Sequence, residues 1–200
     1  PKVLLAILDG FGIAAKNSAN AIAQAKTPNI DTFVQEYTAK AIQSSGESVG
    51  LPMGEMGNSE TGHLNLGAGK IVYQDLPRIN RAILDKSFFA SKALIESIDR
   101  AKANKKTLHL MGLVSSGGVH SYLEHLYALL DLCKQKDISN VYIHAFLDGR
   151  DTPFNSARGF IESLETRLAT LGVGQIATIA GRFYAMDRDN HWERIEKSYN

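Results

Sequence analysis

The sequence has little of what marks several specialised classes of protein. A single cysteine, Cys133, among 200 residues excludes an internal disulfide framework and is compatible with a reducing cytoplasm, where we expect the protein to reside. No apolar run reaches the length of a membrane-spanning helix, and the first residues do not form a signal-peptide pattern. Lys and Arg number 22 against 21 Asp and Glu, so the net charge of +1 provides no overall field for nucleic acid or an anionic membrane.

What is present is the composition of an ordinary globular protein. Hydrophobic residues make up 44% of the chain and charged residues 22%, values close to those of folded soluble domains. Disorder, a collagen helix and a coiled coil are therefore excluded as the main architecture. The length suits one large domain or two small ones with a substantial hydrophobic core.

The first 74 residues combine an apolar strand, a helix and a glycine-rich segment. Residues 3–8 are almost continuously apolar, which predicts a strand buried on both faces and places Asp9 in a crevice at its end. Thr27 and Pro28 are typical of a helix start, and apolar residues follow them at helical spacing. Residues 44–69 hold seven of the 17 glycines, and so long a stretch with little periodicity is usually functional or mobile.

From residue 75 onward the pattern alternates between strands and helices. A helix is expected soon after residue 75, and strands are expected at 108–114, 141–147 and 176–180, about 33 residues apart. The segments between these strands carry apolar stripes at helical spacing. We therefore predict an α/β fold with a parallel sheet and helices on both faces, divided into residues 1–74 and 75–200.

Ionisable side chains follow each predicted strand of the second region. His120 comes after the first strand, Arg150 and Asp151 after the second, and Arg182 and Arg188 after the third. The carboxyl ends of parallel strands meet at one edge of the sheet, so these side chains should converge on one crevice. Three arginines and a histidine would suit a small ligand with several negative charges.

Other readings of these residues stay open on spacing alone. One or two of the arginines could instead cap helix ends or pair with nearby aspartates at positions 148, 187 and 189. Ser59 lies between glycines, but the spacing misses both the nucleophile elbow of hydrolases and the phosphate-binding P-loop, which favours a structural turn. His63 could orient the Ser59 loop or contact a substrate. His109 and His144 are predicted to be sheet-facing residues with satisfied hydrogen bonds.

Six short motifs, taken in order, resemble one family. They are LDGFG at 8–12, GNSETGH at 57–63, LNLGAG at 64–69, SGGVHS at 116–121, FLDGRD at 146–151 and GRFYAMDRD at 181–189. Together they make the chain similar to the 2,3-bisphosphoglycerate-independent phosphoglycerate mutases of the alkaline phosphatase superfamily. The motifs extend over nearly the whole chain, so this likeness outweighs the spacing argument against Ser59.

The resemblance implies a fold and a set of site residues. Residues 1–74 would be the N-terminal part of a metal-binding phosphatase-like domain, and residues 75–200 part of an inserted phosphotransferase domain. Two divalent ions, typically Mn²⁺, would be bound, with Asp9 and Ser59 among their ligands and Ser59 also accepting the phosphoryl group. The residues expected to bind substrate are His120, Arg150, Asp151, Arg182 and Arg188, and Asp151 would also move protons.

The resemblance also implies an activity. It is the interconversion of 3-phosphoglycerate and 2-phosphoglycerate in glycolysis and gluconeogenesis through a phosphoserine, without a 2,3-bisphosphoglycerate cofactor. We expect a monomer whose partner is this small substrate, with no nucleic acid and no membrane. Family chains are more than twice as long and carry the remaining metal ligands, a catalytic lysine and further arginines beyond this stretch. The 200 residues alone are therefore expected to be inactive, and the first 74 poorly stable.

Two alternatives compete with this reading. The chain could belong to another superfamily phosphomutase or phosphatase that uses the same serine and metals. It could also be a non-catalytic module that binds a phosphometabolite through the arginine crevice alone.

Overall fold

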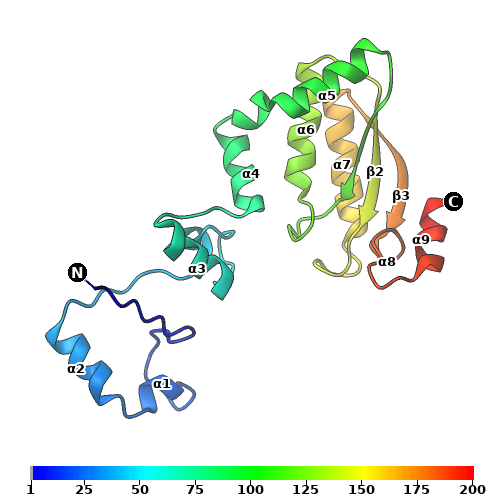
Figure 1. The fold of residues 1–200 in the computed structure, drawn as a ribbon. Coiled ribbons are helices and arrows are strands. Elements are labelled where there is room, and N and C mark those ends of the chain that lie inside the picture. The colour runs from blue at the N-terminus through cyan, green and yellow to red at the C-terminus, as the bar shows by residue number, and fades with distance from the viewer. Residues whose placement is uncertain (1) are drawn as a thin grey trace. The chain divides into compact units, whose positions relative to one another are not determined.

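The computed structural model describes residues 2–200 and divides into two compact units, Pro1–Gln74 and Asp75–Asn200. The first unit contains short helices joined by long irregular segments (Figure 1). These helices are α1 (Ala21–Gln24), α2 (Pro28–Glu36), the 3₁₀ helix η1 (Gly46–Val49) and α3 (Ser59–Ala68).

The strand predicted at residues 3–8 does not form, and that prediction is wrong for this structure. Residues 2–74 as described contain no strand, and Val3 and Leu4 are 92% and 91% exposed. A strand needs neighbouring strands to accept and donate its backbone hydrogen bonds. Without such a neighbour in this unit, the apolar sequence stays irregular and open to solvent.

The two helical segments of the first unit differ in how well the sequence predicted them. Helix α2 begins at Pro28 as expected, although its apolar residue Phe33 remains exposed. Helix α3 lies inside the glycine-rich segment, where no helix was predicted because its apolar residues share no single face. Local capping defines it instead: the Asn58 side chain accepts a hydrogen bond from the Thr61 backbone amide at 2.9 Å. The helix ends at Gly69, which adopts a left-handed conformation.

The second unit is a parallel α/β structure built around a three-stranded sheet (Figure 1). It starts with α4 (Asp75–Leu84), η2 (Ser87–Ala90) and α5 (Lys92–Ala103). The sheet and its crossover helices follow as β1 (Leu108–Leu113), α6 (Leu123–Gln135), β2 (Val141–Leu147), α7 (Ala157–Leu171) and β3 (Gln175–Gly181). The short helices α8 (Arg182–Ala185) and α9 (Trp192–Tyr199) complete the unit. The predicted α/β fold with a parallel sheet is confirmed.

The strands lie in the order β1-β2-β3, and both pairings are parallel. Leu108 pairs with Val141 and Ile143 with Ile176, and a register shift then brings His144 opposite Thr178. His109 Nδ1 lies 2.9 Å from His144 Nε2, so these two residues satisfy each other as predicted. The shared direction of the strands places all three carboxyl ends at one edge of the sheet.

The hydrophobic core lies where α6 and α7 pack on the sheet (Figure 1). Leu130 of α6, Leu164 of α7 and Ile143 of β2 are fully or almost fully buried in it. Met111 of β1 is 71% exposed, so the sheet is more open where this side chain points. Helices α6 and α7 connect consecutive strands and pack on the sheet, so the three strands run in the same direction. The loops that leave them therefore lie at the same edge of the sheet.

No helix among residues 2–200 is both long enough and apolar enough to cross a membrane.

Candidate functional site

The segments that follow β2 and β3 are joined through one arginine and two aspartates. Arg182, directly after β3, donates from its Nη1 atom to Asp148 Oδ1 at 2.9 Å and to Asp151 Oδ2 at 2.6 Å. Both aspartates follow β2. The Arg182 side chain is 12% exposed, so these are charge-assisted contacts in a largely desolvated place.

Asp148 is the most enclosed member of this group. Its side chain is 2% exposed and accepts a hydrogen bond from the Ser115 hydroxyl at 2.6 Å. Its other oxygen accepts from the backbone amides of Arg150 and Asp151 at 3.1 and 3.0 Å. Burial alone would raise the pKa of Asp148, but the hydrogen bonds from Ser115, from both amides and from Arg182 outweigh it and lower the pKa to about 2. Asp148 is therefore ionised at neutral pH.

Gly117, in the loop after β1, allows this close approach of the loops. A Cβ atom at this position would lie 2.9 Å from the Asp151 Cβ and 3.0 Å from Asp148 Oδ2. Its backbone amide donates to the Ser115 hydroxyl at 3.3 Å. A side chain at residue 117 would push the β1 and β2 loops apart.

The structure brings together only part of the predicted crevice. Asp151 and Arg182 are in direct contact, as the strand-end argument predicted. The side chains of His120, Arg150 and Arg188 make no hydrogen bond or ion pair with any of residues 2–200. These three residues follow the ends of the same strands, but within the described part of the chain their side chains form no hydrogen bond or ion pair with one another or with the Asp151–Arg182 pair.

The sequence left open whether one or two of the arginines pair with nearby aspartates, and Arg182 does pair with Asp148. The pairing uses Nη1 alone, so Nη2 and Nε of Arg182 have no hydrogen-bond partner among the described residues. A guanidinium with two nitrogens free retains donors for a bidentate contact with a carboxylate or phosphate.

Ser59 and Asp9 lie together in the first unit. The Ser59 hydroxyl donates to Asp9 Oδ2 at 2.6 Å and lies 3.2 Å from His63 Nδ1. Ser59 is the first residue of α3, which leaves its side chain exposed at the helix start. Gly57 supports the turn before it, because a Cβ there would collide with the Ser44 carbonyl oxygen. The likeness to a family motif, and not the spacing, had pointed to this serine.

The Asp9–Ser59 pair fits part of a divalent-cation site. Carboxylate and hydroxyl oxygens are hard donors of the kind that Mg²⁺ and Mn²⁺ accept. Within residues 2–200, however, no group of three or more His, Cys, Asp or Glu side chains is placed to hold a metal. Two donors do not complete a coordination shell, so among residues 2–200 the pair supplies only part of what such an ion requires.

Sequence reasoning missed the central place of Asp148 and the contribution of Ser115. The spacing indicates Asp148 only as a possible ion-pair partner of a nearby arginine. A signal was available, because Asp148 directly follows a buried strand in the same way that Asp9 follows the predicted first strand. Ser115 is fully buried beside apolar Val114, and a buried hydroxyl of this kind requires a polar partner.

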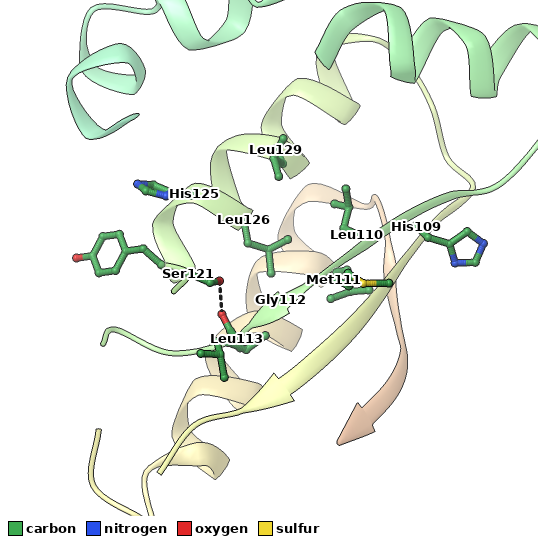
Figure 2. A pocket seen from close by; sticks show the side chains of 12 residues that line it. His109, Leu110, Met111, Gly112, Leu113, Ser121, His125, Leu126 and Leu129 are labelled. Carbon is green, nitrogen blue, oxygen red and sulfur yellow. Dashed lines mark hydrogen bonds between the residues drawn. The ribbon is translucent and has the colours of Figure 1, made fainter. Parts of the chain in front are cut away.

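A separate cavity of about 350 Å³ lies along β1 and the start of α6 (Figure 2). Its lining is mostly apolar and includes Leu110, Leu126 and Leu129. The Ser121 hydroxyl in its wall donates to the Leu113 carbonyl at 2.8 Å, as the dashed line in Figure 2 shows. No predicted site residue lines this cavity, so it is distinct from the strand-end group.

Comparisons with known proteins agree with one another. Residues 79–200 match the family model for the N-terminus of BPG-independent PGAM. The chain is 55% identical to the 2,3-bisphosphoglycerate-independent phosphoglycerate mutase of Clostridium beijerinckii, covering 99% of this chain and 39% of the relative. It is also 55% identical to the same protein of Moorella thermoacetica, with 98% and 38% covered.

A solved structure gives the same result. The crystal structure of Leishmania mexicana phosphoglycerate mutase at low cobalt concentration matches with 32% identity and a TM-score of 0.66. The match covers 96% of this chain and 37% of that one. The chain thus spans about 39% of the length of the curated relatives. On its sequence and its fold, the chain belongs to the 2,3-bisphosphoglycerate-independent phosphoglycerate mutase family.

Proposed function

We propose that the full-length protein carrying this sequence interconverts 3-phosphoglycerate and 2-phosphoglycerate through a phosphoserine on Ser59. The observation that carries this proposal is the exposed Ser59 hydroxyl, hydrogen-bonded to Asp9 at 2.6 Å, in a chain of the mutase family. A serine hydroxyl next to a carboxylate can give up its proton as it attacks phosphorus. Neither bound 2,3-bisphosphoglycerate nor a nucleotide is needed for such a transfer.

The second unit would hold the glycerate part of the substrate. Arg182 has two nitrogens free to donate to a carboxylate or phosphate, and its Nη1 is already fixed by aspartates. Arg150, Arg188 and His120 would add the other contacts, since their side chains have no partner among residues 2–200. Asp151 binds Arg182 through one oxygen, which leaves the other to exchange protons with the glycerate hydroxyls.

Asp9 and Ser59 would also be ligands of a divalent ion, which we propose to be Mn²⁺ and one of two in the complete site. When bound, such an ion supplies positive charge that stabilises the serine oxygen as an alkoxide and offsets the charge of the phosphoryl group. The 200 residues provide only two of the required donors. We therefore propose that this stretch alone does not turn over substrate.

The proposed reaction transfers the phosphoryl group twice. In the first transfer the bond between phosphorus and the substrate O3 breaks and a bond between phosphorus and Ser59 Oγ forms, while Ser59 Oγ loses its proton and O3 gains one. The glycerate then reorients within the arginine contacts. In the second transfer the bond between phosphorus and Ser59 Oγ breaks and a bond between phosphorus and O2 forms, while O2 loses its proton and Ser59 Oγ gains one, which regenerates the serine. Water must be excluded in between, because it would release free phosphate.

The test is an assay of 3-phosphoglycerate conversion by the full-length protein with Mn²⁺. Ser59→Ala should lower kcat by about a thousandfold or more, because a nucleophile has no substitute in its own reaction. Ser163→Ala is the matched control, since Ser163 lies on the exposed side of α7 and bonds only to a helix carbonyl. Undiminished activity in Ser59→Ala would contradict the proposal.

The same preparation tests the finer parts of the proposal. We expect a monomer by light scattering and, in cell fractionation, recovery in the cytoplasm. Faster turnover of a ribose phosphate or an aryl phosphate than of 3-phosphoglycerate would instead assign the protein to another phosphomutase or phosphatase. Binding of 3-phosphoglycerate without turnover or metal dependence would indicate a non-catalytic module.

A further inference from the structure

Asp148 contacts the segments that follow all three strands of the sheet, through Ser115, the amides of residues 150 and 151, and Arg182. We propose that Asp148 is a positioning residue of the phosphoglycerate site: it sets the geometry of Arg182 and of the Arg150–Asp151 backbone without touching the substrate. This inference rests on the proposed function. It assigns a role to a buried residue outside the set expected to bind substrate or metal.

The hydrogen bonds of Asp148, together with its burial, close it off from a ligand. A carboxylate offers about four acceptor positions on its two oxygens. One oxygen accepts from Ser115 at 2.6 Å, and the other from Arg182 at 2.9 Å and from the amides of Arg150 and Asp151 at 3.1 and 3.0 Å. With its side chain 2% exposed, Asp148 can act only through these four hydrogen bonds, which reach three partners: the Arg182 guanidinium, the backbone of the loop after β2, and Ser115.

The first partner is the Arg182 guanidinium. Asp148 and Asp151 both bind Nη1, so two carboxylates fix one corner of the planar group. The remaining nitrogens are then held in one orientation before any ligand arrives. An arginine on its own flexible stem would have to be ordered by the substrate, and that cost would weaken binding.

The second partner is the backbone of the loop after β2. Because one Asp148 oxygen accepts from the amides of residues 150 and 151, the loop forms a tight turn that fixes where these two side chains start. Gly149 makes the turn possible with a φ of 95°, and a Cβ there would lie 3.2 Å from the Phe154 Cα. Two proposed substrate ligands therefore depend on the same carboxylate.

The third partner ties in the loop after β1. Ser115 is fully buried, and its hydroxyl both donates to Asp148 and accepts from the Gly117 amide. Three residues beyond Gly117 this loop reaches His120. Asp148 is thus the common anchor of segments that carry the proposed ligands from three strands.

The unit also contains a comparable ion pair between two of its helices. Arg167 of α7 donates to both oxygens of Asp131 of α6 at 2.6 and 2.8 Å. This pair is about one third exposed and joins two helices that carry none of the proposed ligands. Asp131→Asn therefore removes an Asp–Arg pair without touching the site.

The experiment measures KM and kcat for 3-phosphoglycerate with full-length Asp148→Asn and Asp131→Asn proteins. Asp148→Asn should raise KM by about tenfold to a hundredfold, because misplaced contacts weaken binding by this order. Asp131→Asn should keep the parental KM. A loss of folded protein would lower the apparent kcat and leave KM unchanged, so KM separates positioning from stability. Removal of a negative charge would by itself favour binding of the anionic substrate and lower KM. A rise in KM therefore cannot come from the change in charge and indicates lost positioning.

A double-mutant cycle identifies the route. If Asp148 acts through Arg182, adding Asp148→Asn to Arg182→Ala should raise KM by less than threefold beyond Arg182→Ala alone, a limit of about 0.7 kcal/mol of residual effect. Should Asp148→Asn fail to fold, Ser115→Ala decides, with an expected rise in KM of about threefold from one lost hydrogen bond.

The outcomes separate the two proposals. A parent protein that does not interconvert phosphoglycerates would contradict the proposed function. An active parent with an equal or lower KM in Asp148→Asn, or in Ser115→Ala if that variant must be used, would overturn only the role of Asp148. Full additivity with Arg182→Ala would overturn the route through Arg182.

Discussion

The two units of the chain contain similar apolar segments but bury very different amounts of them. The second unit holds a cluster of 13 buried residues between the sheet and its helices. In the first unit, Val49 and Leu51 are the buried hydrophobic residues among those described. Residues 3–8 and residues 141–147 are both apolar and suited to a strand, yet only the latter form one.

The difference shows that an apolar strand pattern is necessary for a sheet but not sufficient. Strand β2 has a partner on each side and helices over its buried face. Residues 3–8 have no partner strand within residues 2–74, so their backbone groups make no sheet hydrogen bonds there. The curated relatives are more than twice as long as this chain, and we expect residues 3–8 to pair only in such a longer chain.

The largest contrast should appear in amide hydrogen exchange of the 200-residue chain. Amides of residues 141–147 should exchange at least about a hundredfold more slowly than those of residues 3–8, because exchange of a central strand requires the core to open. Mass spectrometry of peptic peptides measures both segments at once. Equal protection of the two segments would break the comparison, and protection of residues 3–8 in the full-length protein alone would sharpen it.

Core truncation should reproduce this contrast in the free energy of unfolding. Leu130→Ala removes a fully buried side chain from α6 and should cost about 2 to 5 kcal/mol. The same change at Leu4, which is exposed, should cost less than about 0.5 kcal/mol. Urea unfolding followed by circular dichroism gives both values. Point mutants typically lower the free energy of unfolding by about 1 kcal/mol. A loss larger than about 1 kcal/mol in Leu4→Ala would therefore show that the first unit packs this side chain.

Acid should weaken the second unit through Asp148. Because the folded-state pKa is lowered from 3.8 to about 2, the unfolded chain binds the proton first, and stability is lost as pH falls from about 4 to about 2. The loss should approach about 2 kcal/mol, at about 1.4 kcal/mol per pKa unit. Unfolding measured across this range should show the loss in the parent and in Asp137→Asn, whose aspartate is exposed, but not in Asp148→Asn.

The smallest expected effect concerns helix caps, one in each unit. Asn58 caps α3 through its side chain, whereas Ser91 at the start of α5 makes no such hydrogen bond. Asn58→Ala should cost about 1 kcal/mol and speed exchange of the Thr61 amide about fivefold. Ser91→Ala should leave the amides of the first turn of α5 unchanged. Unchanged exchange at Thr61 would show that the cap contributes nothing to α3.

Sequence reasoning predicted the second unit well because its signals are local. The segment 141–147 coincides with β2, since a short apolar run between turns has few alternatives in an α/β pattern. The helices between the strands followed from stripes of apolar residues. The contact between Asp151 and Arg182 followed from the rule that parallel strands end together.

What the sequence did not predict depends on contacts made in three dimensions. Helix α3 has no apolar face and rests on a cap, which periodicity does not detect. The strand at residues 3–8 needed partners that the pattern itself does not supply. The four hydrogen bonds of Asp148 come from residues up to 34 positions away from it in the chain, so no local motif describes them. Ser59 is indicated as a site residue by the family motif, whereas its spacing from the neighbouring glycines favours a structural turn.

The single cysteine provides a natural probe for the rate at which the core of the second unit opens. Cys133 is fully buried on α6, and burial raises the pKa of its thiol to about 11. Only a thiolate that reaches solvent reacts with a disulfide reagent, so labelling must wait for the core to open. Residues 2–74 contain no cysteine, so they contribute nothing to the labelling signal. Labelling rates, with or without phosphoglycerate, therefore report how often α6 lifts from the sheet, without any introduced probe.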